Sequence, residues 1–233
     1  MTQSETAMTP ILAPRSAGYW GLSLAEFVLG GAIVVAHNVY HLVPNEVPIL
    51  FVLGIASIRL REGNWRAIGL ALPKSWGITI LIALATAVTV ILVGQLVTEP
   101  LAQAMGLHTA KSAPTALGLR KGDVWSLAKA LGVVWTFAAF GEEVGYRRYL
   151  LGRAADIGNR SAVAYGIALF CVSVLFGIGH YYQGPAGMFT TACDGLMIGA
   201  AYLLSRRNLW VAVLAHGFID TIALGAVFLG LAD

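Results

Sequence analysis

Long apolar stretches alternate with short polar connections along the chain. Most of these stretches approach the ~20 residues that a helix needs to cross a bilayer. Seven are recognisable, at about 19–40, 47–60, 76–97, 124–155, 161–180, 187–204 and 209–231. The second is short, and we expect it to be tilted or partly interfacial. Because no stretch alternates with the period of a membrane strand, the pattern predicts an all-α, polytopic transmembrane helical bundle with about seven to eight spans.

The remaining segments are polar. Residues 1–16 are irregular and predict a disordered N-terminal tail, and residues 17–233 then form a single transmembrane domain. The longest connection, at about 98–123, contains Pro100 and Pro114 and predicts a loop with a short amphipathic piece at 101–107.

Composition agrees with a membrane protein. Of the 233 residues, 58% are hydrophobic and only 12% are charged, whereas soluble domains carry about 25% charged residues. The formal net charge is +3, and the basic residues lie between the apolar runs instead of on one polar face. This distribution suits loops that face anionic lipid and argues against a nucleic-acid partner.

The basic residues also predict an orientation. One alternate set of connections is rich in arginine and lysine, namely Arg15, Arg59, Arg61, Arg66, Lys74, Arg148, Arg153, Arg160, Arg206 and Arg207. The opposite set holds Lys111, Arg120 and Lys121. The positive-inside rule therefore predicts a multi-pass protein of the cell membrane with a cytoplasmic N-terminus. With seven spans, the C-terminus would lie outside.

Two adjacent carboxylates, Glu142 and Glu143, lie in the fourth apolar run. A charge in the hydrocarbon core costs about 3 kcal/mol or more, so an intramembrane carboxylate is usually functional. Arg147 follows Glu143 by four residues and can pair with it on one helix face. Such a pair is often purely structural. In an α-helix Glu142 would point about 100° away from Glu143, toward a different neighbour.

Two histidines add to this candidate site. Phe176 and His180 end the fifth run, and His216 and Asp220 share a helix face in the seventh. At 1.5 Å per residue, the depths of Glu142, His180 and His216 below the cytoplasmic surface are roughly 20, 25 and 12 to 18 Å. These depths agree within about two helical turns, so the three runs predict one shared site inside the membrane.

The three motifs resemble those of a known family. They read Glu142-Glu143-Val-Gly-Tyr-Arg147, Phe176-Gly-Ile-Gly-His180 and His216-Gly-Phe-Ile-Asp220. In this order they are similar to the CPBP family of intramembrane proteases, which includes the type II CAAX prenyl endopeptidases and bacterial Abi-type proteins. The resemblance covers about residues 125–225. Tyr146 stands where phenylalanine is usual, and Asp220 stands where asparagine is common.

The resemblance implies a membrane-bound peptide hydrolase that acts on a membrane-associated peptide or protein. Glu142 and His180 would activate water, and His216 with Asp220 would stabilise the oxyanion. Glu143 and Arg147 complete the catalytic set.

Asp220 leaves the use of a metal open. An ionised aspartate cannot donate a hydrogen bond to an oxyanion. Either Asp220 is protonated, or it orients His216 as the donor, or the site is that of a metalloprotease. In the last case His180, His216 and a carboxylate such as Asp220 would be a plausible Zn²⁺ set, with Glu142 as the base.

Two other functions fit the same residues. A non-catalytic relative could act as an immunity factor or as a scaffold for a membrane partner. A proton-coupled transporter could also use Glu, His and Asp side chains at mid-depth. Outside the motifs, Asp194 could line the same site, and His37 with His41 is expected to form an interfacial pair.

Overall fold

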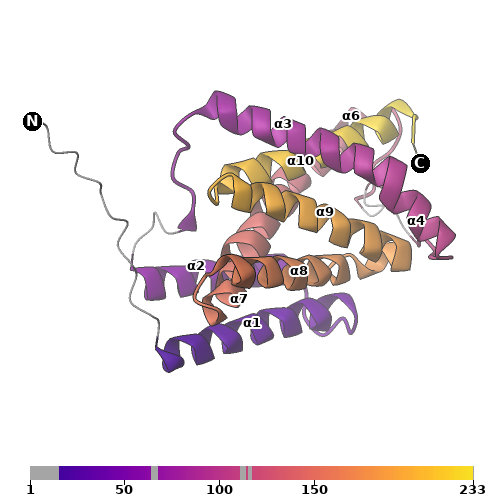
Figure 1. The fold of residues 1–233 in the computed structure, drawn as a ribbon. Coiled ribbons are helices and arrows are strands. Elements are labelled where there is room, and N and C mark those ends of the chain that lie inside the picture. The colour runs from indigo at the N-terminus through magenta and orange to yellow at the C-terminus, as the bar shows by residue number, and fades with distance from the viewer. Residues whose placement is uncertain (1–15, 64–67, 111–113, 115–116, 233) are drawn as a thin grey trace, which may run out of the picture.

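The computed structural model describes residues 16–63, 68–110, 114 and 117–232. The predicted tail at 1–16 therefore lies almost wholly outside the described residues. Within them the chain forms helices and turns with no strand, which confirms the all-α fold class. In Figure 1, α1 and α3 lie at opposite edges of the bundle, and the body from α6 to α7 runs across the space between them.

The first half of the chain forms three helical bodies. These are α1 (Ala17–Asn38), α2 (Glu46–Glu62), and the continuous run of α3 (Trp76–Val93), the π-helical turn η2 (Gly94–Thr98) and α4 (Glu99–Ala104). The third body extends into the segment where a loop was predicted from residue 98. Pro100 lies in the first turn of α4. A proline inside a helix clashes with the preceding turn, and the π turn η2 directly before it lets the helix continue.

The second half of the chain supplies most of the core. Its first body is α6 (Val124–Val133), the π-helix η3 (Val134–Leu150) and α7 (Leu151–Ile157) in direct succession. It is followed by α8 (Ala162–Ile178), the 3₁₀ turn η4 (Tyr181–Gln183), α9 (Gly184–Leu204) and α10 (Leu209–Leu229). The seven helical bodies among the described residues correspond to the seven predicted apolar runs, with the third extending beyond its run.

Side-chain caps explain where most of these helices begin. A side-chain oxygen of the preceding residue accepts a backbone N–H of the first turn, which satisfies a donor that has no partner inside the helix. The capping residues are Ser16, Asn45, Ser75, Asp123, Ser161 and Asn208. At Asp123, which lies outside the spans, the N–H of Ser126 lowers the pKa of the carboxyl below its usual value.

Fewer helices than predicted are long and apolar enough to cross a membrane. Among the described residues five qualify, at Ala17–Asn38, Trp76–Ala104, Val124–Ile157, Tyr181–Leu204 and Leu209–Leu229. The predicted number of seven to eight spans is therefore too high by this criterion. The helices α2 and α8 have 17 residues each. In α2 the polar ends shorten the apolar stretch, and α8 ends at a turn just before His180.

The π-helix η3 occupies the centre of the bundle. It packs against α2 and α10, and α8 packs mainly against α9. The core contains Leu50 from α2, Tyr146 and Tyr149 from η3, and Phe176 from α8, all of them buried. Most of the site residues therefore stand on packed helices, whereas His180 lies in the turn that directly follows α8.

The close contact between α8 and α9 depends on Gly177. A Cβ atom at this position would lie 2.4 Å from the backbone oxygen of Met188 and 2.8 Å from the Cβ of Ala192. Backbone atoms cannot rotate away from such a clash. Gly177 follows Phe176 directly, so the same contact fixes the end of α8 that carries His180.

We therefore expect Gly177→Ala to destabilise the protein by about 1–3 kcal/mol through overpacking. The matched control is Gly166→Ala in the same helix, because a Cβ atom there meets nothing within 4 Å. Thermal unfolding of both variants in one detergent measures the difference. Equal melting temperatures for Gly177→Ala and Gly166→Ala would contradict this account of the α8–α9 contact.

Candidate active site

The glutamate pair stands on the π-helix η3. Helices with i→i+5 hydrogen bonds are rare and are found mostly at functional sites. The same i→i+5 hydrogen-bond pattern is present at the end of η3, where the N–H of Leu151 donates to the carbonyl of Tyr146. Because each turn holds more residues than in an α-helix, Glu142 and Glu143 are rotated by a smaller angle than the 100° predicted from α geometry.

Glu143 points into the protein interior and has two partners. Its side chain is fully buried. Its Oε1 atom lies 3.1 Å from the Nη1 of Arg147 and 2.8 Å from the Nδ1 of His216. The spacing predicted the pairing with Arg147, whereas the contact with His216 joins η3 to α10 and was not predicted. A buried charge is tolerated only when it is paired in this way.

Arg147 extends this buried pair to two further helices. The side chain is 1% exposed. Its guanidinium lies 4.1 Å from the centre of the Phe176 ring in α8, a cation–π contact. Its Nη2 atom also donates to the carbonyl of Gly195 in α9 at 3.4 Å. Arg147 therefore holds α8 and α9 against η3.

His216 lies between two carboxylates. Its Nδ1 faces Glu143, and its Nε2 lies 3.5 Å from the Oδ2 of Asp220. Since a carboxylate only accepts, the ring donates its Nδ1–H to Glu143. His216 and Asp220 share one face of α10, as their spacing predicted.

His180 stands just beyond the end of α8. Its Nδ1 atom donates to the carbonyl of Phe176 at 2.9 Å. In the neutral ring this bond leaves Nε2 as a hydrogen-bond acceptor. The Phe176 ring lies 4.9 Å from the His180 ring and 6.0 Å from the His216 ring, measured between centroids. Phe176 thus contacts both imidazole rings.

A cavity of about 650 Å³ brings the predicted residues together. Its walls include Glu142, His180, His216 and Asp220, together with Asp194. The Oε2 atom of Glu142 is buried and has no hydrogen-bond partner among the described residues. Glu143 and Arg147 are not part of the wall and lie behind it.

The N-terminal half of the chain contributes a polar wall that the sequence did not reveal. His37 Nε2 lies 3.1 Å from Glu46 Oε2, and both residues line the cavity with Asn38. His37 was expected to pair with His41 at the membrane interface, and this expectation is wrong. The only signal in the sequence was Glu46 itself, an isolated carboxylate at the start of the second apolar run.

The side chains do not converge as a zinc site. Within the described residues no group of three or more His, Cys, Asp and Glu side chains is arranged to hold a metal ion. Both ring nitrogens of His216 already face carboxylates, and the Nδ1 of His180 is bound to a carbonyl. The suggested ligands His180, His216 and Asp220 therefore do not fit a metal ion in this arrangement.

Comparison with known proteins bears on the same segment. Residues 124–222 match the family model described as type II CAAX prenyl endopeptidase Rce1-like. No curated protein and no solved structure matches the chain. The matched segment begins with α6, ends within α10 and contains all three motifs. The resemblance to the type II CAAX prenyl endopeptidases is thereby confirmed over residues 124–222, the segment that matches their Rce1-like family model.

Proposed function

We propose that the protein is an intramembrane endopeptidase that hydrolyses a peptide bond of a membrane-associated substrate. The observation that carries this proposal is the shared cavity, in which Glu142 and His180 face His216 and Asp220 inside an apolar bundle. The family match supports the same reaction class, because the matched family is one of proteases. A scaffold or immunity factor has no need of such a polar cavity.

Glu142 acts as the general base. Its Oε2 atom has no partner in the described residues and is free to accept a proton from a water molecule. The Nε2 of His180 accepts the second hydrogen of the same water, since its Nδ1–H is held by Phe176. The water oxygen then attacks the carbonyl carbon of the substrate, and the proton passes to Glu142.

His216 serves the oxyanion that forms. With Nδ1–H donated to Glu143, a second proton on Nε2 lets the ring donate to the carbonyl oxygen as it becomes negative. Asp220 keeps Nε2 turned toward the cavity. When the tetrahedral intermediate collapses, the C–N bond breaks, Glu142 returns its proton to the leaving nitrogen, and a carboxylic acid and an amine are released. Glu143 and Arg147 position His216 and touch no reacting atom.

We further propose that the protein lies in the cell membrane with a cytoplasmic N-terminus. Most basic residues gather at the end of the bundle where α1 begins, α2 ends and α9 turns into α10. At this end Arg61 donates a hydrogen bond to the backbone carbonyl of Tyr19 in α1, and Arg153 donates one to Glu62 in α2. The opposite end carries Arg120 and Lys121, so the distribution favours this orientation.

Replacement of the base tests the reaction. We expect Glu142→Gln and His180→Ala each to lower cleavage at least about a hundredfold, since a positioned acid or base contributes at least that much. Peptides released from membranes of cells that express wild-type protein or variant measure this. Glu99→Gln, an exposed glutamate outside the cavity, is the matched control.

Three outcomes separate the functions. An endopeptidase loses its product peptides in Glu142→Gln and keeps them in Glu99→Gln. A scaffold keeps its partner and its effect on cells in both variants. A transporter loses a proton-coupled flux in Glu142→Gln, while wild-type membranes release no peptide. Either the scaffold result or the transporter result would refute the proposal.

Glu143 should matter for stability more than Glu142 does. Removing one partner of a buried ion pair costs about 3–5 kcal/mol, so Glu143→Gln should melt well below wild type and Glu142→Gln close to it. In the double variant Glu143→Gln with Arg147→Met, no charge is left unpaired. Thermal unfolding should then show less destabilisation than the sum of the single changes, and strict additivity would exclude this coupling.

Cysteine labelling tests the orientation. In a background with Cys171→Ser and Cys193→Ser, a membrane-impermeant maleimide added to intact cells should label Lys121→Cys but not Lys74→Cys. Permeabilised cells should be labelled at both positions, which controls for access. The reverse labelling pattern in intact cells would place the N-terminus outside.

A further inference from the structure

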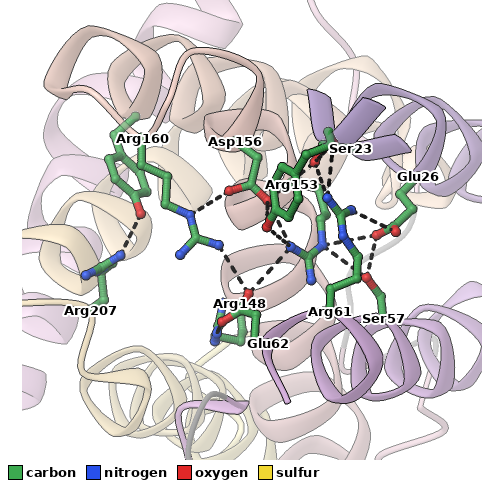
Figure 2. Close-up of polar contacts among 12 residues, drawn as sticks. Ser23, Glu26, Ser57, Arg61, Glu62, Arg148, Arg153, Asp156, Arg160 and Arg207 are labelled. Carbon is green, nitrogen blue, oxygen red and sulfur yellow. Dashed lines mark hydrogen bonds and ion pairs between the residues drawn. The ribbon is translucent and has the colours of Figure 1, made fainter. Parts of the chain in front are cut away.

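Six arginines gather at the end of the bundle that carries the start of α1. They are Arg61, Arg148, Arg153, Arg160, Arg206 and Arg207, and we call them the arginine cluster. All of them except Arg206 are labelled in Figure 2. They come from α2, η3, α7 and the two turns that follow α7 and α9. The proposed mechanism uses none of them.

The carboxylates nearby neutralise only part of this charge. Glu26 pairs with Arg61 and Arg153, and Asp156 pairs with Arg153 and Arg160. Glu62 lies 2.9 Å from Arg148, 3.5 Å from Arg153 and 3.2 Å from Arg160. The six arginines of the cluster thus outnumber these three carboxylates, and the cluster retains positive charge.

The excess charge is concentrated at Arg206 and Arg207. No carboxylate of the described residues forms an ion pair with either of them. Arg207 donates to the hydroxyl of Tyr165 at 2.7 Å, a contact that leaves its charge uncompensated. Figure 2 shows Arg207 apart from the carboxylate network, on the far side of Arg160.

A cavity of about 270 Å³ lies among these residues. Its charged lining consists of Arg148, Arg160, Arg206, Arg207 and Glu62, and Tyr165 and Tyr202 add hydroxyl groups. Because Glu62 is already shared by three arginines, it does not cancel the charge of Arg206 and Arg207. The cavity is therefore a polar, cationic site that is separate from the cavity around Glu142.

The backbone at both turns is held in an unusual conformation. Arg160 has a φ of 55°, and Arg206 and Arg207 have φ angles of 60° and 62°. This left-handed region normally favours glycine or asparagine. Strained residues persist where the surrounding structure or a function needs them. All three of these arginines line the same cavity.

We propose that this cavity binds a phosphate group, carried either by a lipid headgroup or by a small soluble phosphate. Guanidinium groups form paired, charge-assisted hydrogen bonds to phosphate oxygens, and several of them converge here. Basic pockets between membrane helices on the cytoplasmic side are typical sites for anionic headgroups. The site goes beyond the peptidase function and does not depend on it.

Binding measurements on the full-length purified protein test the site and its source. Isothermal titration with sodium phosphate in detergent probes the soluble source. Native mass spectrometry after reconstitution in phosphatidylcholine nanodiscs, with and without phosphatidic acid, probes the lipid source. Saturable binding in either arm supports the site and identifies its ligand, whereas binding in neither arm refutes it.

Variants show whether the bound phosphate occupies this cavity. Arg206→Gln should weaken phosphate binding about fivefold, which is the loss expected when one arginine is removed from the neighbourhood of an anionic group. The double variant Arg206→Gln, Arg207→Gln should weaken the binding further. Lys74→Gln is the matched control, because it removes one exposed positive charge outside the cavity. The single variant covers the case in which loss of the Arg207–Tyr165 contact unfolds the double variant. An equal loss in Lys74→Gln and Arg206→Gln would refute the site.

Discussion

A buried carboxylate at Glu143 is the constraint on which the rest of the site depends. An unpaired charge at this depth would cost several kcal/mol, so the fold must supply partners from other helices. Arg147 provides the opposite charge one turn away on the same helix, and His216 provides a hydrogen-bond donor from α10. Arg147 in turn lies against Phe176 of α8 and binds the Gly195 carbonyl of α9. Satisfying one carboxylate thus fixes the positions of four helical elements, and both imidazoles are held on the same cavity as a result.

The two adjacent glutamates, Glu142 and Glu143, have different surroundings, and these suit them to different roles. Glu143 is fully enclosed, and its Oε1 atom is held by both Arg147 and His216. Glu142 faces the cavity with an oxygen atom that lacks a protein partner among the described residues. The Oε2 atom of Glu143 also lacks a partner among the described residues, but Glu143 lies behind the cavity wall and not in it. A group that exchanges protons with water must line the cavity, whereas a group that holds a histidine in place must be bonded to that histidine. The neighbouring positions on η3 meet both requirements because successive side chains point in different directions.

Much of this arrangement could be predicted from the sequence, for physical reasons. Lipid allows only helices that satisfy their own backbone, so apolar runs located all seven helical bodies. Spacing of four residues predicted the pairs Glu143–Arg147 and His216–Asp220 because it places side chains on one face. The winding of η3 could not be predicted, since π and α turns use the same residues and differ only through tertiary packing. The wall formed by His37 and Glu46 was missed for a similar reason: it comes from residues distant in sequence, and no local spacing links them to Glu142.

The helix that runs from α6 through η3 to α7 connects the two polar regions of the bundle. Arg147 and Arg148 are neighbours in the chain, yet Arg147 turns to Glu143 behind the cavity and Arg148 turns to Glu62 in the arginine cluster. Arg153 lies further along the same helix and joins the network of Glu26 and Asp156. In an apolar surrounding, each of these charges needs a fixed partner, so neither region can shift without disturbing the other through η3. The ion pairs of the arginine cluster therefore serve the candidate active site as well, because they hold the helix that carries Glu142 at a fixed depth and rotation.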